Sequence, residues 1–208
     1  MKKRLLTIED LIDFCKKQKN FTKFSSKEYG YELCVEMPAV FETAESSDDT
    51  MFMGNVLVMH TSRNLNNSFV TESAAKKAIK NIAYVPVLAA FCEIDGVRDF
   101  TDHDFEILDD GTIIYNEKQI GCVTADPAYF MDDEKIPDRK NVYAKVAIPR
   151  NYTDAAEIIE RKGGTDVSVE LSVNDLSWDA NEGVLMLNDI TILGLTCLGK
   201  DPETGRDV

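Results

Sequence analysis

The sequence has few histidines and few basic residues, and each shortage narrows the chemistry open to the chain. Its 208 residues include only two histidines, and Asp and Glu outnumber Lys and Arg by 37 to 23, which gives a net charge of −14. Nucleic-acid surfaces need clustered Lys and Arg to contact phosphates, and anionic membranes attract basic segments. We therefore expect neither nucleic acid nor membrane as a partner.

Paired cysteine motifs are also missing. The five cysteines are odd in number, none has a C-x-x-C spacing, and most lie in apolar runs. This usage predicts reduced, buried thiols. Neither histidine has a cysteine pair nearby, and no glycine-rich phosphate-binding loop or G-x-S-x-G motif occurs. We expect no metal and no organic cofactor.

Long apolar runs are the third shortage. The basic N-terminus is followed by Glu9 and Asp10 rather than by an apolar segment of signal-peptide length, and no stretch is long enough to span a membrane. The sequence therefore predicts a protein that stays in the cytoplasm where it is made.

Short apolar strands separated by turns dominate what is present. Helices are expected after the N-caps Thr7, which has Asp10 in the capping-box position, Thr71 and Thr153. The apolar run 85–91 contains Pro86, which predicts an edge strand or an extended segment. Further strands are expected at 31–37, 52–60, 113–115, 119–123, 142–148 and 165–173, in a hairpin at 177–187, and at 189–198.

The order of these elements shows no regular βαβ alternation. We therefore predict an α+β fold, a mainly antiparallel β-barrel with flanking helices. The expected division is an N-terminal helical arm at 1–40, the barrel domain at 41–200 and a flexible C-terminal end at 201–208.

The stretch 165–173 alternates with period two. Val167 and Val169 fall on one face of the expected strand, and Ser168 and Glu170 on the other. A hydroxyl and a carboxylate two residues apart on one face can act on the same space. An ordinary strand with its polar face in water gives the same pattern, so both interpretations stay open.

A serine that acts as a nucleophile needs a base, most often histidine. The candidates are His60, which ends an apolar strand, and His103, which stands between Asp102 and Asp104. Neighbouring carboxylates raise the pKa of an imidazole and fix its tautomer. For either histidine alone, a surface or structural role remains the alternative.

Taken in order, several short motifs resemble the tailed-phage prohead proteases, which are capsid maturation proteases related to herpesvirus assemblin. Two further stretches resemble the branch found in phages and prophages of Gram-positive bacteria. The motifs are HD at 103–104, QIG at 119–121, VYAKVAIP at 142–149 and VSVEL at 167–171, with HTSRNLNNSF at 60–69 and ILGLTCLG at 192–199.

The resemblance implies an assemblin-like barrel and a serine endopeptidase in which Ser168 is the nucleophile and His103 is the base. In many phage relatives an acidic residue stands in the last strand, where this sequence has Gly194. The orienting third residue is therefore expected to be Glu170, with Asp104 and Asp189 as alternatives.

The same resemblance implies the partners. They are the scaffold protein and major capsid protein of the prohead, the protease itself as a substrate, and further copies in a homo-oligomer. The expected location is the assembling prohead in the cytoplasm of the bacterial host. The alternatives are a catalytically silent capsid-assembly protein of the same fold, and an unrelated barrel that serves as a binding module.

Overall fold

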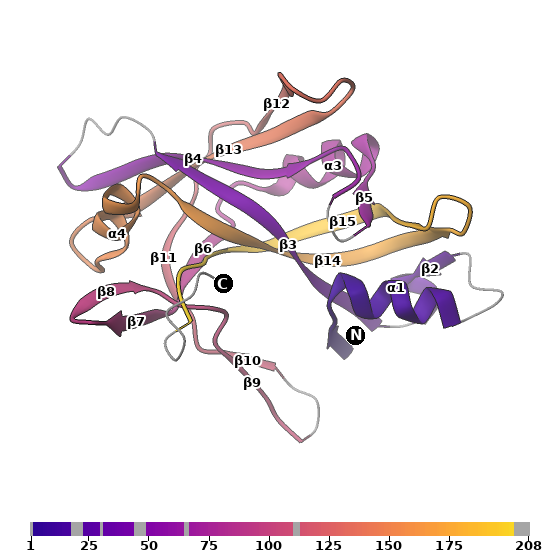
Figure 1. The fold of residues 1–208 in the computed structure, drawn as a ribbon, viewed down its shortest axis with the longest axis horizontal. Helices are drawn as coiled ribbons and strands as arrows, with labels where there is room; N and C mark the ends of the chain where they lie inside the picture. The colour runs from indigo at the N-terminus through magenta and orange to yellow at the C-terminus, as the bar shows by residue number, and fades with distance from the viewer. Residues whose placement is uncertain are drawn as a thin grey trace.

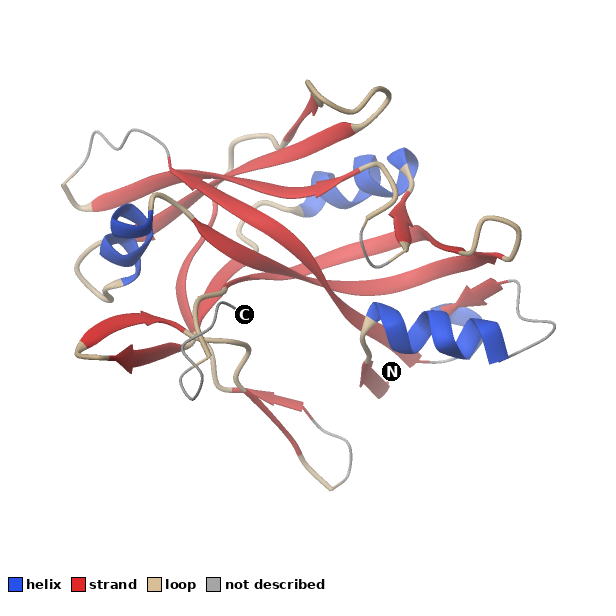
Figure 2. Cartoon of the chain, in the orientation of Figure 1, coloured by secondary structure: helices blue, strands red, loops and turns tan. Residues whose placement is uncertain are grey.

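The computed structural model describes residues 2–17, 23–29, 31–43, 49–64, 67–109 and 113–201. Strands dominate, and the helices lie at the periphery (Figures 1 and 2). The helices are α1 (Ile8–Lys17), α2 (Ser26–Tyr29), α3 (Glu72–Ala78), the 3-10 turn η1 (Ile79–Asn81) and α4 (Ala155–Lys162). The strands are β1 (Lys2–Leu5), β2 (Lys23–Ser25), β3 (Tyr31–Thr43), β4 (Met51–His60), β5 (Ser68–Val70), β6 (Pro86–Ala89), β7 (Phe91–Ile94), β8 (Val97–Phe100), β9 (Phe105–Ile107), β10 (Ile113–Tyr115), β11 (Lys118–Val123), β12 (Tyr129–Asp132), β13 (Lys140–Pro149), β14 (Thr165–Asp179) and β15 (Val184–Cys197).

Seven of these strands close into a barrel. Hydrogen bonding runs from β3 to β4, β13, β11, β6, β15 and β14, and β14 pairs back onto β3. All of these pairings are antiparallel except that between β6 and β15. A closed ring with an odd number of strands must contain at least one parallel pair, because strand direction cannot alternate all the way round. The predicted α+β fold with a mainly antiparallel barrel is confirmed.

The barrel interior is filled by one face of each strand. β4 shows the alternation clearly. Phe52, Val56 and Val58 are completely buried and Gly54 is buried, whereas Met53, Asn55 and Leu57 are partly exposed. α1 and α4 each bury one apolar face, as expected for amphipathic helices on a sheet surface. The core is therefore continuous from the barrel to the helices that flank it.

Two of the three helix caps predicted from sequence are present. The Thr7 hydroxyl accepts from the backbone N–H of Asp10 at 3.1 Å, and the Asp10 carboxylate accepts from the N–H of Thr7 at 3.2 Å. Thr71 accepts from the N–H of Ala74 in the same way. Because each cap satisfies backbone donors that a helix leaves open, these residues fix where α1 and α3 begin. The third prediction is wrong by one residue, because the N-cap of α4 is Asp154, and Thr153 accepts from the N–H of Ala155 at 3.3 Å.

Three segments differ from the sequence-based expectations or lie partly outside the described residues. β6 starts at Pro86 and is bonded on both sides, so it is a wall strand rather than the predicted edge strand. β3 begins at Tyr31 and crosses the expected boundary near residue 40. Of the expected C-terminal end at 201–208, residues 202–208 lie outside the described residues.

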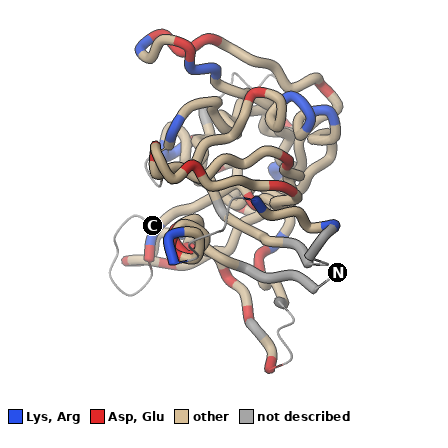
Figure 3. The backbone as a smooth tube through the Cα atoms, turned by 90° about the vertical axis from the view of Figure 1, so that its right-hand side faces the viewer, with Lys and Arg blue, Asp and Glu red and all other residues tan. Residues whose placement is uncertain are grey.

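The surface carries charges of both signs. Figure 3 shows Lys and Arg positions scattered among Asp and Glu positions along the chain. In the described ranges, no helix combines the length and the apolar character that a membrane crossing needs.

Candidate functional site

The site begins on β14, whose two faces differ as its alternation predicts. Val167, Val169 and Leu171 are at most 1% exposed and belong to the barrel core. Ser168 and Glu170 lie on the opposite, outward face. That face is not open to solvent: Ser168 is 5% exposed, and the Glu170 side chain is 13% exposed. The interpretation of an ordinary strand with a polar face in water is therefore wrong.

The segment between β8 and β11 supplies the other half of the site. Here the chain leaves the barrel wall and forms the β9–β10 hairpin, which projects below the barrel in Figure 1. The backbone N–H of Asn116 donates to the carbonyl of Asp104 at 2.7 Å, which closes the base of this hairpin. His103 and Glu117 flank the closed base and therefore lie next to each other.

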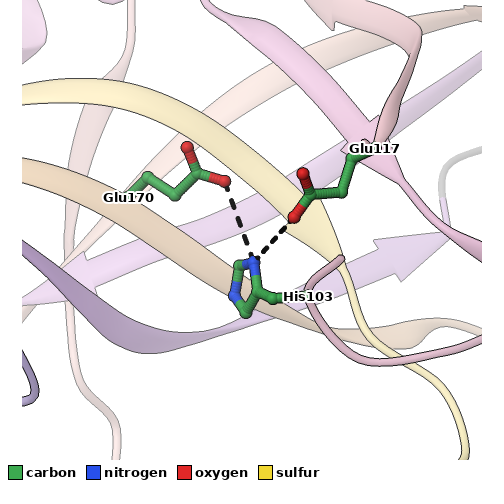
Figure 4. A group of neighbouring side chains, drawn as sticks. All are labelled: His103, Glu117 and Glu170. Carbon is green, nitrogen blue, oxygen red and sulfur yellow. Dashed lines mark hydrogen bonds and ion pairs between the residues drawn. The ribbon is translucent and has the colours of Figure 1, made fainter. Parts of the chain in front are cut away.

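The three side chains meet with their polar atoms facing inward (Figure 4). His103 Nδ1 lies 3.1 Å from Glu117 Oε1 and 4.0 Å from Glu170 Oε1. The His103 side chain is 7% exposed and that of Glu117 is completely buried. We call these three residues the His–Glu–Glu cluster.

The buried carboxyl of Glu117 is held in its ionised form. Burial acts to raise its pKa, but hydrogen bonds from the His103 ring and from backbone N–H groups outweigh burial and lower the pKa below its ordinary value. One of these donors is the N–H of Asp104, 3.2 Å from Glu117 Oε1. An ionised carboxylate only accepts hydrogen bonds, so the proton of the shared bond is on His103 Nδ1.

Glu170 is fixed by its neighbours on β15. The Thr196 hydroxyl donates to Glu170 Oε1 at 2.6 Å. Gly194 lies opposite Glu170 in the strand register, and a Cβ there would come within 2.9 Å of Glu170 Oε2 and 3.2 Å of Leu88. The pairing shifts just beyond this point, where Leu193 is an extra residue in β15. Glycine at 194 therefore makes the room that the Glu170 carboxylate occupies.

Of the three residues predicted to be catalytic, the structure brings His103 and Glu170 together. Ser168 lies two positions from Glu170 on the same face, about 7 Å along the strand, and pairs in register with Thr196. Among the hydrogen bonds of the described residues, none joins Ser168 Oγ to the His103 ring. Strand geometry alone links Ser168 to the cluster.

The alternative orienting residues have other partners. The Asp104 carboxylate accepts from the Asn116 side chain at 3.2 Å. The Asp189 carboxylate forms an ion pair with Lys77 at 2.5 Å. The carboxylate that lies 3.1 Å from His103 Nδ1 is that of Glu117, which was not among the residues predicted from sequence.

Comparison with known proteins identifies the family. Residues 50–207 match the sequence profile of the YonD N-terminal domain. Because the match covers most of the chain, the protein belongs to this family, which is a phage-type domain. No curated protein matches the sequence. No solved structure matches either.

Proposed function

We propose that the protein is a serine endopeptidase with Ser168 as nucleophile, His103 as general base and Glu117 as the residue that orients the imidazole. The observation that carries the proposal is the buried pair of His103 and Glu117, set beside the strand face that holds Ser168. Glu117 takes the orienting role expected for Glu170 because its carboxylate is closer to Nδ1 by about 1 Å.

The proposed chemistry uses the proton that His103 shares with Glu117 at Nδ1. With the proton on Nδ1, a neutral imidazole keeps its lone pair on Nε2, which is the atom that accepts the serine proton. Ser168 Oγ would then bond to the scissile carbonyl carbon while Nε2 takes its proton. The same nitrogen returns the proton to the amine as the peptide C–N bond breaks, and water hydrolyses the resulting ester.

The substrates we propose are the scaffold protein, segments of the major capsid protein, and the protease itself, within the prohead in the bacterial cytoplasm. Membership of a phage-type family supports a setting of this kind. A homo-oligomeric assembly on the prohead belongs to the same proposal. It rests on the resemblance to prohead proteases in the motifs around His103 and Ser168.

The burial of Ser168 favours a second candidate, a catalytically silent capsid-assembly protein of the same fold. A residue that is 5% exposed cannot reach a peptide bond unless the residues that cover it move. The peptidase proposal therefore requires the residues that cover Ser168 to move when a substrate binds. A silent protein requires no such movement.

Co-production with the scaffold protein of the same phage or prophage tests the proposal. We expect the wild type to shorten the scaffold protein and Ser168→Ala to leave it intact, as read from gels and intact-mass spectra. Ser172→Ala is the matched control, because Ser172 lies on the same strand face, is 2% exposed, and its Oγ has no hydrogen-bond partner among the described residues. Equal processing by wild type and Ser168→Ala would refute the peptidase and leave the silent protein.

A further inference from the structure

The second glutamate beside His103 has no role in the peptidase mechanism. A serine peptidase needs one carboxylate to orient its histidine, whereas this imidazole has two within 4.0 Å. Two carboxylates that face one imidazole nitrogen form a donor set of the kind that holds a divalent cation.

One oxygen of the cluster is also unsatisfied. The Glu117 side chain is completely buried, and its Oε2 atom has no hydrogen-bond partner among the described residues. A buried carboxylate oxygen needs a donor or a cation. The orphaned oxygen and the convergence of three potential ligand atoms are separate observations, and one cation bound by the cluster would account for both.

We propose that His103, Glu117 and Glu170 bind one divalent transition-metal cation, with Zn²⁺ the best match. The three residues each offer a ligand atom, and these atoms lie within 4.8 Å of one another. Bonds of about 2.0–2.2 Å to Zn²⁺ put neighbouring ligands roughly 3–3.5 Å apart. The 3.1 Å separation of His103 Nδ1 and Glu117 Oε1 already fits, and Glu170 Oε1, 4.0 Å from Nδ1, has to move closer for a cation to bind all three.

The surroundings match what supports metal ligands in proteins. The Thr196 hydroxyl holds Glu170, and the N–H of Asp104 holds Glu117, so both carboxylates are oriented before any cation arrives. One imidazole and two carboxylates suit Zn²⁺, Mn²⁺ or Fe²⁺ better than Mg²⁺, which prefers oxygen ligands alone.

The cation has a consequence for the peptidase, and this step rests on the proposed function. A metal on Nδ1 displaces the proton from that nitrogen, and the neutral ring then carries its proton on Nε2. Nε2 can no longer accept the proton of Ser168. Cation binding and peptidase activity therefore exclude each other, so the site is inhibitory.

Binding is measured without any activity assay. Full-length Ser168→Ala protein is treated with EDTA, dialysed against ZnCl₂, MnCl₂ or MgCl₂, and analysed by elemental mass spectrometry and titration calorimetry. We expect one Zn²⁺ per chain, weaker binding of Mn²⁺ and no binding of Mg²⁺. Adding Glu117→Gln or Glu170→Gln should weaken Zn²⁺ binding at least about tenfold. Adding Glu182→Gln, in an exposed turn, should leave it unchanged.

Absence of Zn²⁺ binding, or binding that Glu170→Gln leaves intact, would overturn the proposal. Glu170→Gln is the decisive variant because its side chain is partly exposed and the fold tolerates a polar replacement better there than at the fully buried Glu117. Circular dichroism checks that each variant is folded. The two proposals are tested separately. Zn²⁺ binding together with unchanged processing by Ser168→Ala would refute the peptidase proposal and support the cation site.

Discussion

The two histidines of the chain occupy opposite electrostatic surroundings. His103 faces two carboxylates, whereas His60, at the end of β4, is partly buried near the Arg139 guanidinium. Burial and the Arg139 charge lower the pKa of His60 below its ordinary value of 6.5. The backbone N–H of Ser62 donates to His60 Nδ1 at 3.3 Å, so that nitrogen carries no proton. His60 is a neutral structural histidine.

This difference predicts how stability depends on pH. As the pH falls below 6.5, the unfolded chain takes up a proton at His60 before the folded chain does, so the free energy of unfolding decreases. His60→Asn removes that proton uptake. We expect the variant to lose less stability than the wild type between pH 7.5 and pH 5.5, as measured by urea unfolding at each pH.

The quantity to compare is the change in the free energy of unfolding between pH 7.5 and pH 5.5, because His60→Asn also changes the contacts of residue 60 at every pH. An equal or larger loss of stability in the variant over this interval would contradict the lowered pKa. The prediction does not require the variant and the wild type to have the same free energy of unfolding at pH 7.5.

At the scale of elements, the end of α4 depends on one backbone conformation. Gly163 is the C-cap residue with φ 70°, in the left-handed region, and its N–H donates to the carbonyl of Glu160 at 3.2 Å. The helix beneath it buries Ile158 and Ile159 against the core. Glycine is needed here because a Cβ is strained at this φ.

Gly163→Ala is expected to lower the free energy of unfolding by about 1 kcal/mol. The cost comes from the left-handed backbone conformation alone, because a Cβ at this position would meet no atom within 4 Å. Gly163→Asn should lose less, because asparagine tolerates this conformation better than alanine. Urea unfolding of both variants checks the order. Alanine as stable as glycine would show that the helix end does not hold this backbone conformation.

Local patterns predicted elements well where each element carried its own signal. The period-two alternation around Ser168 and the caps at Thr7 and Thr71 predicted structure correctly because they depend on neighbours within four residues. The prediction of an edge strand from Pro86 was wrong. A proline at the first residue of a wall strand leaves the later N–H groups of that strand free to pair. Strand content was predictable, whereas the partners of each strand were not.

At the scale of the whole molecule, the site depends on barrel closure. β14 and β15 bring Ser168, Glu170 and Thr196 to one outward face, and the excursion after β8 lays His103 and Glu117 over that face. From the sequence, His103 was one of two histidine candidates until the family resemblance singled it out, and Glu170 was named from its place two residues after Ser168 on one strand face. Glu117 could not be found because its role arises from the closed base of the β9–β10 hairpin, and no periodicity or spacing marks it.

The register of the barrel also explains the departure at Gly194. From sequence, a glycine in the last strand left the third catalytic position open. In the barrel, Gly194 faces Glu170 across the β14–β15 pair and leaves room for its carboxylate. The carboxylate at this place therefore comes from β14 rather than from β15, a relation that only strand pairing reveals.

Labelling with a small fluorophosphonate probe tests the central claim most directly, because it needs no knowledge of the substrate. Such probes phosphonylate a serine hydroxyl whose proton a neighbouring base removes. The full-length protein is incubated with the probe, digested and mapped by mass spectrometry. We expect the label on Ser168, its loss in His103→Ala, and its retention in His60→Asn. A folded protein that leaves Ser168 unlabelled, or that labels Ser168 equally without His103, would contradict the proton-relay pair on which the proposed function rests.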